Sequence, residues 1–579
     1  MRAPLPGWRV LAEPEACELE SMTGDQKMGL GMRQVVIIGG VAGGMSAATR
    51  LRRLDPEASI TVLEKSSYVS YANCGLPYHI GGVIARKQDL LLQTAESLNI
   101  RFNLDVRILS EVVGIDRQTK TVLVRDLRTD REYVLDYDQL ILSPGAQPVV
   151  PPIPGIERAL TLRTVEDVSR IVKAVEDGPK SAVVIGGGFI GIETAENLRH
   201  RGIRTSLVEA LDQVLSPLDP EMAMLVAGEM TKHGITLHLG RSVKAIYEEW
   251  VELSDGEQIN ADLVILAIGV RPDTRLARLA GLEIGSRGGI STNSYNQTSD
   301  PSIYAVGDAA EKVDALDGTA SLVPLANIAN RQGRAVADHI MGRETRWVPT
   351  IGTAIVKVFD LTVATAGWNE KRLRAAGRDY MAIHAHPNSH AGYYPGAESM
   401  AIKILIDPNT NLIMGAQAVG GKGVDKRIDV IATAMRAGLR AEDLADLELA
   451  YAPPFGSAKD PINMLGYIAE NLTSGFTKSV QWDELQSRVE NGAVLIDVRT
   501  DGEFASGHIP NSVNIPVDEL RSRINELSGD EIIIYCQVGV RGHTATSLLR
   551  GYGYEAANLD GGYQTWVNSP ASIAVDTYV

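Results

Sequence analysis

Short apolar runs that end in glycine-rich turns recur in the first half of the chain. Gln34–Ile38 and Ser181–Ile185 are apolar runs of strand length, and clustered glycines follow each of them. After a helical stretch, a second apolar run ends in glutamate in both places, over Ser59–Glu64 and over Thr205–Glu209. This repeated pattern predicts two β-α-β units.

The pattern changes at about Trp347. From there strand-like runs alternate with turns and a helical stretch follows, which predicts an α+β domain. After Ser474, two further strand-like runs with helices between them predict a separate unit. The expected elements are strands over 303–306, 351–359, 380–386, 399–406, 493–497 and 531–535, and a helix over 424–437.

A chain of 579 residues is long enough for several domains, because single hydrophobic cores rarely grow beyond about 250–300 residues. Residues 1–32 carry scattered prolines and no periodic apolar face, so we expect a disordered or artificial extension, with Cys17 incidental. The predicted domains are 33–147 together with 274–345, then 148–273, 346–473 and 474–579.

Charge and cysteine content restrict the partners. The net charge of −16 argues against a nucleic-acid partner, because phosphate backbones need a clustered positive surface. Three cysteines in so long a chain form no disulfide framework, so we expect a cytoplasmic protein in a reducing environment. No apolar run approaches the ~18 residues of a membrane span. We expect neither a membrane partner nor a metal cofactor.

The first glycine turn reads Gly39-Gly-Val-Ala-Gly-Gly44. Glycines let the backbone approach a pyrophosphate, and the N-terminus of the following helix stabilises its charge. Val41 departs from the usual fingerprint, which has a glycine there. Glu64, 20 residues after Gly44, is placed to bind a ribose diol. The alternative is a tight strand–helix turn without a ligand.

The second turn, Gly186-Gly-Gly-Phe-Ile-Gly191, fits the fingerprint fully. Glu209 follows Gly191 by 18 residues. A carboxylate at this strand end accepts a hydrogen bond from a 2′-hydroxyl and repels a 2′-phosphate, which favours NADH over NADPH. The nearby Arg204 leaves that preference open.

Residues 33 to about 345 resemble the two-dinucleotide flavoprotein disulfide reductases, on both glycine turns and on the segments Tyr137–Ala146 and Tyr304–Asp308. The resemblance implies two Rossmann-like domains, the first for FAD and the second for NADH, followed by an α+β dimerisation domain and hence a homodimer. The implied FAD contacts are Gly39, Gly40, Ala42, Gly43, Gly44, Glu64, Lys65, Ala146, Asp308 and Ala326. The implied NADH contacts are Gly186, Gly188, Gly191, Glu193, Glu209 and Gly269, with Glu193 beside the nicotinamide.

Cys74 has no second cysteine near it. A dithiol reductase of this family uses Cys-x-x-x-x-Cys, but Val69 and His79 stand at the two positions where the second thiol would be. We therefore expect Cys74 to form a mixed disulfide with an external thiol. A helix N-terminus or a flavin contact can lower the pKa of such a thiol.

The segment Ser70–Gly75 resembles the single-cysteine subgroup of that family: coenzyme A disulfide reductases, NADH oxidases and NADH peroxidases. The oxidases and peroxidases carry a catalytic histidine where Ala42 stands, so the chain is more similar to the coenzyme A disulfide reductases. The implied coenzyme A contacts are Ser46, Arg53, Ser70, Asn73 and Lys459. Tyr394 and Tyr451, with Tyr393, resemble the tyrosines that reach the active site of the other subunit.

The last hundred residues resemble the rhodanese family over about 478–570. Cys536 follows a strand, and the N–H groups of the loop Cys536–Arg541 are expected to curl around its sulfur. Arg541 closes this loop and can bind an anionic sulfur donor. Four residues are expected to brace the domain: Asp497, Arg499, Glu503 and His508. The alternative is an inactive rhodanese-like module.

The two thiols together suggest an NADH-dependent reductase of coenzyme A persulfide, polysulfide and coenzyme A disulfide. Cys536 relays sulfane sulfur, and Cys74 works through Cys74–S–S–CoA. The sequence leaves open which of these substrates is physiological and whether the two cysteines exchange sulfur directly. Two alternatives remain, an NADH oxidase and a redox-sensing or sulfur-relay scaffold without catalysis.

Overall fold

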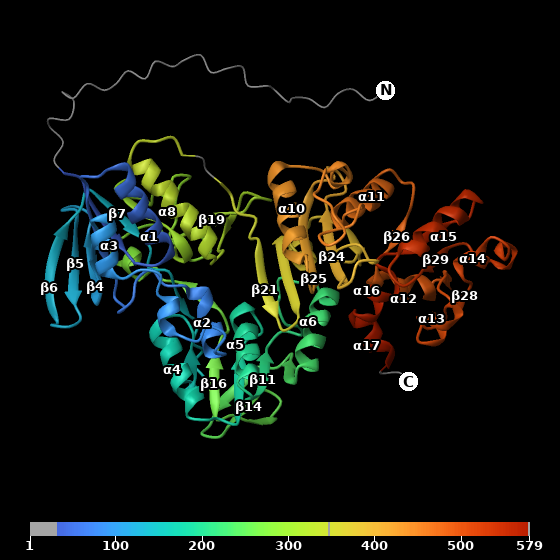
Figure 1. The fold of residues 1–579 in the computed structure, drawn as a ribbon, viewed down its shortest axis with the longest axis horizontal. Coiled ribbons are helices and arrows are strands. Elements are labelled where there is room, and N and C mark those ends of the chain that lie inside the picture. Colours follow the sequence, from blue (N-terminus) through green and yellow to red (C-terminus); the bar gives the residue numbers. More distant parts are fainter. Residues whose placement is uncertain (1–31, 346–347, 577–579) are drawn as a thin grey trace, which may run out of the picture.

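The computed structural model describes residues 32–345 and 348–576, so the extension predicted over 1–32, apart from Met32, and Cys17 lie outside the described residues. Four domains, called first to fourth in chain order, each have their own sheet (Figure 1). The first and second carry parallel sheets, the third an antiparallel sheet, and the fourth a parallel sheet. The predicted fold class is confirmed.

The first domain has the sheet order β18-β7-β1-β2-β3. The strands are β1 (Gln34–Ile38), β2 (Ser59–Leu63), β3 (Asp105–Arg107), β7 (Gln139–Leu142) and β18 (Ile303–Ala305), and a separate antiparallel sheet holds β4 (Ser110–Asp116), β5 (Thr121–Asp126) and β6 (Arg131–Asp136). The helices are α1 (Ala42–Leu54), α2 (Leu76–Ile80), α3 (Ala95–Phe102), α7 (Arg275–Leu279) and α8 (Ala326–Ile340). Helices α1 and α8 touch backbone to backbone, because a Cβ on Gly333 would lie 2.2 Å from the carbonyl oxygen of Gly43.

The second domain repeats this layout with the order β12-β11-β10-β16-β9. Its strands are β9 (Leu160–Thr161), β10 (Ser181–Ile185), β11 (Arg204–Glu209), β12 (Ile235–Leu239) and β16 (Leu263–Leu266), with β13 (Val243–Ile246), β14 (Trp250–Leu253) and β15 (Gln258–Asn260) in a small antiparallel sheet. Its helices are α4 (Val165–Glu176), α5 (Phe189–His200) and α6 (Pro220–Lys232). The chain enters and leaves this domain through one antiparallel pair, β8 (Ala146–Pro148) and β17 (Val270–Pro272). This pair explains how the first domain is built from two separate stretches of sequence.

The third domain has the order β21-β22-β25-β24-β23. Its elements are β21 (Ala354–Val358), β22 (Leu361–Gly367), α9 (Glu370–Ala375), β23 (Met381–Ala385), β24 (Met400–Ile406), β25 (Ile413–Gly420), α10 (Val424–Ala437) and α11 (Pro461–Thr473). The helix predicted over 424–437 matches α10. Strand β21 begins three residues later than predicted, because Gly352 has a φ of +75° that no extended strand adopts. Strands β22 and β25 were not predicted.

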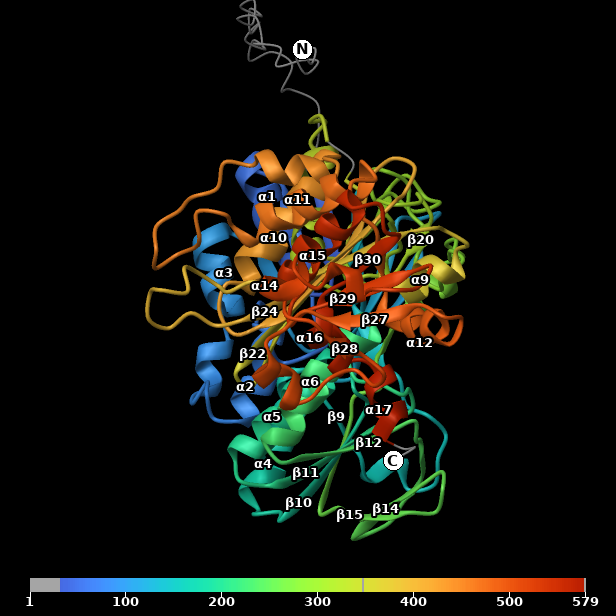
Figure 2. The same ribbon diagram turned by 90° about the vertical axis from the view of Figure 1, so that its right-hand side faces the viewer.

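The fourth domain has a fully parallel sheet in the order β26-β30-β29-β27-β28. Its strands are β26 (Ser479–Val480), β27 (Val494–Asp497), β28 (Val513–Asn514), β29 (Ile532–Tyr535) and β30 (Ala556–Leu559). Its helices are α12 (Trp482–Glu490), α13 (Asp501–Ala505), α14 (Val517–Leu520), α15 (Val540–Gly551), α16 (Gly562–Val567) and α17 (Pro570–Asp576). Figure 2 views the molecule from this domain, with the second domain below it. Within the described chain, no helix is both long and apolar enough to cross a membrane.

Candidate active sites

Both glycine turns form the tight strand–helix junctions that the sequence predicts. Gly39 and Gly186 have φ values of +101° and +112°, which favour glycine. A Cβ on Gly44 would lie 1.9 Å from the carbonyl oxygen of Gly39, and one on Gly191 would lie 1.9 Å from that of Gly186. A Cβ on Gly188, in contrast, would meet nothing within 4 Å, so this turn leaves open space at its helix start.

The two strand-end glutamates are held in the same way. Glu64 accepts hydrogen bonds from the N–H groups of Gly40 (2.8 Å) and Ser66 (2.9 Å). Glu209 accepts them from Gly187 (2.6 Å) and Leu211 (2.8 Å). Each carboxylate therefore lies against the glycine turn of its own domain, where a bound ribose would meet it. Burial raises the pKa of Glu64 despite these hydrogen bonds.

Three helix starts provide N–H groups for phosphate. Helices α1, α5 and α8 have no side-chain cap and no acidic residue in the first turn. Uncapped N–H groups at a helix start favour an anion. The residues present therefore fit a dinucleotide in the first domain, at Ala42 and Ala326, and a second one at Gly188.

The contacts assigned to Lys65, Ala146 and Gly269 stay predictions. Lys65 is exposed, Ala146 is buried in β8, and Gly269 has a φ of +110°.

Cys74 is an exposed thiol next to the first glycine turn. It lies in a short 3-10 helix, Asn73–Gly75, that leads directly into α2. Ser70 fixes the start of this segment: its backbone is left-handed, with a φ of +47°, and its N–H group donates to the carbonyl of Gly40 (2.8 Å). The chain thus places the solitary thiol beside the turn predicted to hold FAD.

The protein surroundings do not activate this thiol. Partial burial, and then the negative charge of Glu193, raise the pKa of Cys74, and the Arg163 guanidinium opposes them. Arg163, which the sequence did not point out, stabilises the thiolate together with a backbone N–H group.

Arg163 and Tyr78 are site residues that the sequence analysis missed. Arg163 donates to Asp308 (2.7 Å) and lies between β9 and α4, where nothing in the sequence marks it. Tyr78 on α2 donates to Glu193 on α5 (3.1 Å), which joins the Cys74 segment to the second glycine turn. Burial raises the pKa of Glu193 to about 7, so this carboxyl group gains and loses its proton near neutral pH.

The predicted coenzyme A contacts fall on two domains. Ser46 and Arg53 lie on α1, where Ser46 donates to Asn330 (2.9 Å) and the Arg53 guanidinium lies 5.5 Å from the centre of the Phe102 ring. Asn73 precedes Cys74. Lys459 instead lies on the third domain, just before α11, and is exposed.

The tyrosines predicted to line an active site are exposed on the third domain. Tyr393 and Tyr451 hydrogen-bond each other through their hydroxyl groups (3.0 Å), and Tyr394 packs edge-on against His390. Tyr393 is 76% exposed, and its neighbour across the loop pair, Phe455, is 72% exposed. The two loops are joined by the Ala391 N–H to Gly456 carbonyl hydrogen bond (2.9 Å). They form an aromatic surface that points away from the protein core.

Cys536 lies at a strand end, as the sequence predicts. Cys536 directly follows β29 and is 1% exposed. Helix α15 begins at Val540 with no side-chain cap, and the first hydrogen bond at its start runs from the His543 N–H to the Gly539 carbonyl (2.8 Å). The preceding N–H groups are therefore free to surround a sulfur anion.

Arg541 is held in place by Glu503. The guanidinium donates two hydrogen bonds to the carboxylate (2.8 and 2.6 Å), which lowers the pKa of Glu503 to about 2. Glu503 first, and then Cys536, raise the pKa of Arg541. The predicted bracing is also confirmed for Asp497 and Arg499, a buried ion pair at 2.7 Å. His508 stacks on Phe504 (3.9 Å between ring centres).

Comparison with known proteins agrees with this geometry. Residues 33–333 match the pyridine nucleotide-disulphide oxidoreductase family, 353–460 match the dimerisation domain of that family, and 481–569 match the rhodanese-like domain. The chain belongs to the pyridine nucleotide-disulphide oxidoreductases and is an oxidoreductase with a rhodanese-like domain. The predicted family is confirmed, and membership implies FAD and a nicotinamide cofactor.

Three relatives show where in this family the chain lies. A coenzyme A disulfide reductase of Staphylococcus haemolyticus is 33% identical over 443 residues, which are 76% of this chain and 100% of that protein. The crystal structure of the reduced Bacillus anthracis protein named CoADR-RHD is 51% identical, with a TM-score of 0.92 and coverage of 93% of this chain and 98% of that one. The NAD-dependent persulfide reductase from A. fulgidus is 37% identical, with a TM-score of 0.87 and coverage of 92% and 100%.

Proposed function

We propose that the protein is an NADH-dependent reductase of coenzyme A persulfide, polysulfide and coenzyme A disulfide, and that its fourth domain supplies sulfane sulfur. The observation that carries this proposal is the solitary, exposed Cys74 beside the first glycine turn. With Val69 and His79 at the positions of a second thiol, the redox partner must come with the substrate. The names of the relatives support the same substrate class.

The chain's own groups divide the work at Cys74. The Cys74 thiolate attacks the inner sulfur of a coenzyme A persulfide, the S–S bond breaks, hydrosulfide leaves, and Cys74–S–S–CoA forms. Glu193, with its pKa near 7, is positioned by Tyr78 to hand a proton to the departing sulfur. FAD held by Glu64 and the starts of α1 and α8 would supply two electrons from NADH, and reduction of this disulfide would return the Cys74 thiolate and release coenzyme A.

Recognition of coenzyme A requires local positive charge on an acidic protein. Arg53 and Lys459 are assigned to its phosphates, and Ser46, Ser70 and Asn73 to the region near the sulfur. Because Lys459 and the tyrosine pair lie on the third domain, we propose that a homodimer brings them to the Cys74 of the other subunit. The exposed Tyr393 and Phe455 support this arrangement, since large exposed aromatic surfaces mark interfaces.

Cys536 supplies the sulfur. Its thiolate attacks the sulfane sulfur of a donor such as thiosulfate, the S–S bond of the donor breaks, and sulfite leaves with the electron pair. The coenzyme A thiolate then attacks the outer sulfur of the Cys536 persulfide, which gives coenzyme A persulfide and regenerates Cys536. The free N–H groups before α15 stabilise the negative sulfur in each step.

Intact mass of the denatured protein tests this proposal. After incubation with coenzyme A disulfide, we expect one coenzyme A adduct that disappears on thiol reduction and is absent from Cys74→Ser. A wild-type protein that gains no adduct contradicts the proposal. An NADH oxidase is the rival function, and NADH oxidation that follows oxygen rather than added disulfide would favour it. Ala42, where oxidases have a catalytic histidine, counts against that rival.

A further inference from the structure

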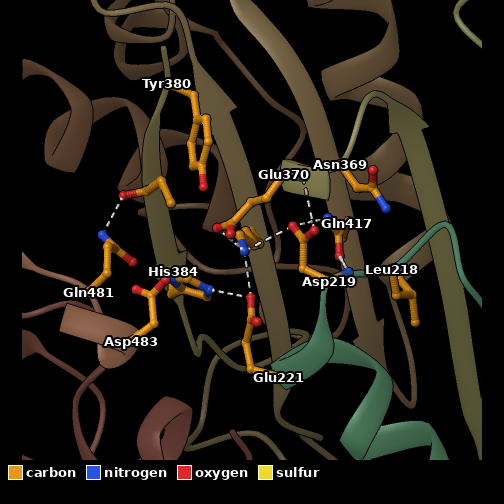
Figure 3. Close-up of polar contacts among 12 residues, drawn as sticks. Leu218, Asp219, Glu221, Asn369, Glu370, Tyr380, His384, Gln417, Gln481 and Asp483 are labelled. Carbon is orange, nitrogen blue, oxygen red and sulfur yellow. Dashed lines mark hydrogen bonds and ion pairs between the residues drawn. The ribbon is translucent and has the colours of Figure 1, made fainter. Parts of the chain in front are cut away.

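A buried ionic cluster joins the second and third domains. The Lys403 ammonium on β24 contacts Asp219 (2.9 Å), Glu221 (2.5 Å) and Glu370 (2.6 Å), and its side chain is fully buried. Figure 3 shows these carboxylates converging on one nitrogen. Lys403 therefore occupies the position between three acidic groups that a cation would take.

His384 on β23 extends this cluster to the fourth domain. Its Nε2 lies 3.0 Å from Glu221, and its Nδ1 lies 2.7 Å from Asp560, while its backbone N–H also donates to Asp560 (2.9 Å). An imidazole between two carboxylates must donate from both nitrogens, so it is an imidazolium. Burial opposes this charge, but Asp560 and Glu221 outweigh it and raise the pKa of His384 to about 9.

Asp560 begins a turn that lies between the third domain and the Cys536 loop. On one side, a Cβ on Gly561 would lie 2.8 Å from Cβ of His384. On the other side, a Cβ on Gly562 would lie 2.3 Å from the Cys536 carbonyl oxygen and 2.9 Å from the Gly539 nitrogen. Both glycines have positive φ, +67° and +63°. The turn thus fits tightly between two backbones, and a displacement on one side must move the other.

Hydrogen bonds connect this turn to both of its neighbours. The Tyr563 N–H donates to the Cys536 carbonyl (2.8 Å), and the Gln564 N–H donates to the Gln537 carbonyl (2.9 Å). On the other side, Nε2 of His386 lies 2.8 Å from the hydroxyl oxygen of Thr565. Strand β23 and His386 just after it therefore contact the segment Asp560–Thr565, and this segment in turn contacts the Cys536 loop.

We propose that His384, through Asp560 and the Asp560–Tyr563 turn, positions the Cys536 loop for sulfur transfer, so that the third domain controls the reactivity of the fourth. His384 is a positioning residue: it contacts neither sulfur nor substrate. This inference rests on the proposed sulfur transfer at Cys536. The positive charge of His384 adds an ionic contact to the hydrogen bond from its backbone N–H to Asp560, and loss of that charge loosens the turn.

The pH dependence follows from every charged group that faces His384. Asp560 and Glu221 favour its charge, while Lys403 on β24 and burial disfavour it. His386, which directly follows β23, has its pKa lowered to about 3 by burial and by His384, so it is neutral. Because the folded pKa of His384 lies above its ordinary value, the ionic part of the contact is complete below about pH 6.5 and is lost as the pH rises through about 9.

The rate of Cys536 persulfide formation from thiosulfate, followed by intact mass, tests the inference in the full-length holoprotein. We expect His384→Gln and Asp560→Asn to slow sulfur loading about tenfold at neutral pH, the effect of a small misplacement of reacting groups. NADH-dependent coenzyme A disulfide reduction should stay within about twofold, which reports an intact fold. Asp530→Asn, on an exposed loop of the same domain, is the matched control.

The pH profile separates positioning from simple structural damage. The ratio of wild-type to His384→Gln loading rates cancels the titration of Cys536 itself, and should fall to one above about pH 9. Equal rates for wild type and both variants at neutral pH, or a ratio constant across this range, overturn the inference.

A measurement without variants covers the case in which they do not fold. In the wild-type protein, the Tyr563 amide should be protected from hydrogen exchange at neutral pH and lose protection above about pH 9, after correction for intrinsic rates. Unchanged protection across this range also overturns the inference. A wild-type protein that takes up no sulfur contradicts the proposed transfer instead, and amide protection still tests the coupling.

Discussion

The two cysteines that are proposed to react, Cys74 and Cys536, lie in opposite environments. Cys74 is exposed, lies on a short helical turn, and has its pKa raised by burial and by Glu193. Cys536 is 1% exposed, lies between β29 and the uncapped start of α15, and has the Arg541–Glu503 pair close to it. The surroundings raise the pKa of Cys74, whereas Cys536 has next to it an uncapped helix start, whose N–H groups are predicted to hold a sulfur anion.

This difference indicates how the two sites acquire reactivity. A persulfide nest needs only one loop and one helix start, so a domain of about a hundred residues can supply it. A thiol that exchanges electrons with FAD and with an external thiol must stay accessible to both, and accessibility excludes a closed nest. We infer that bound cofactor and substrate complete the Cys74 site, whereas the fold alone completes the Cys536 site.

The largest expected effect separates the two thiols. Cys74→Ser should lower NADH-dependent sulfide release from coenzyme A persulfide by about 10³-fold or more, since the nucleophile is lost. Cys536→Ser should retain coenzyme A disulfide reduction and lose persulfide formation from thiosulfate. Sulfide release and sulfur loading are measured on both variants. Full sulfide release by Cys74→Ser would falsify the proposed role.

Arg541 tests whether the Cys536 site is complete without substrate. Arg541→Ala should slow sulfur loading from thiosulfate about 10- to 100-fold, because a charge-assisted anion contact is lost. Arg541→Lys should recover part of the rate, since it keeps the charge and loses the paired hydrogen bonds to Glu503. Stopped loading reactions analysed by mass give the rates, and NADH-dependent disulfide reduction in the same samples should not change.

Glu209 tests which nicotinamide cofactor the second domain prefers. Glu209→Gln should raise the KM for NADH about tenfold and leave that for NADPH unchanged or lower, because the carboxylate no longer accepts from the ribose or repels a phosphate. Steady-state kinetics with both cofactors measure the ratio. Glu249→Gln, on an exposed loop of the second domain, is the control. An unchanged ratio contradicts the assignment.

Glu193 gives the smallest expected effect and examines why Cys74 is not activated. In the NADH-reduced enzyme, Glu193→Gln should lower the pKa of Cys74 and speed its alkylation at mildly alkaline pH roughly two- to fivefold. In the wild type, Glu193 loses its proton as the pH rises through about 7 and then opposes the thiolate. Tyr78→Phe removes the hydrogen bond that lowers the pKa of Glu193 and so reduces the negative charge there, and its alkylation rate should lie between those of the wild type and Glu193→Gln. Equal rates in all three proteins would contradict this account.

Local features of the sequence predicted much of the fold. The helix over 424–437 and the strands at 34–38 and 181–185 match the structure because their signals are periodicity and glycine turns, which act over a few neighbouring residues. Strands β22 and β25 were missed. Both are mixed runs of small residues, Thr362–Gly367 and Gly415–Gly420, that become strands by pairing with each other in the centre of a sheet.

Local sequence also pointed to the groups that are proposed to react, but not to the residues that contact and position them. Cys74, Cys536 and both glycine turns carry recognisable spacings. Arg163 has none, and it reaches Asp308 across 145 positions. His384 and Asp560, 176 positions apart, likewise became partners only when two domains met.

By itself, the sequence determined the number and type of domains, the dinucleotide turns and the two solitary thiols, because backbone geometry and local chemistry impose them within short segments. The tertiary structure alone decided which charged and hydrogen-bonding groups surround each thiol. It brings Glu193, which raises the pKa of Cys74, and Arg163, which lowers it, close to the same thiol. It also brings His384 into contact with Asp560, at the start of the turn that contacts the Cys536 loop. Charge and burial act through space, and distances in space between distant segments are set only when the chain packs.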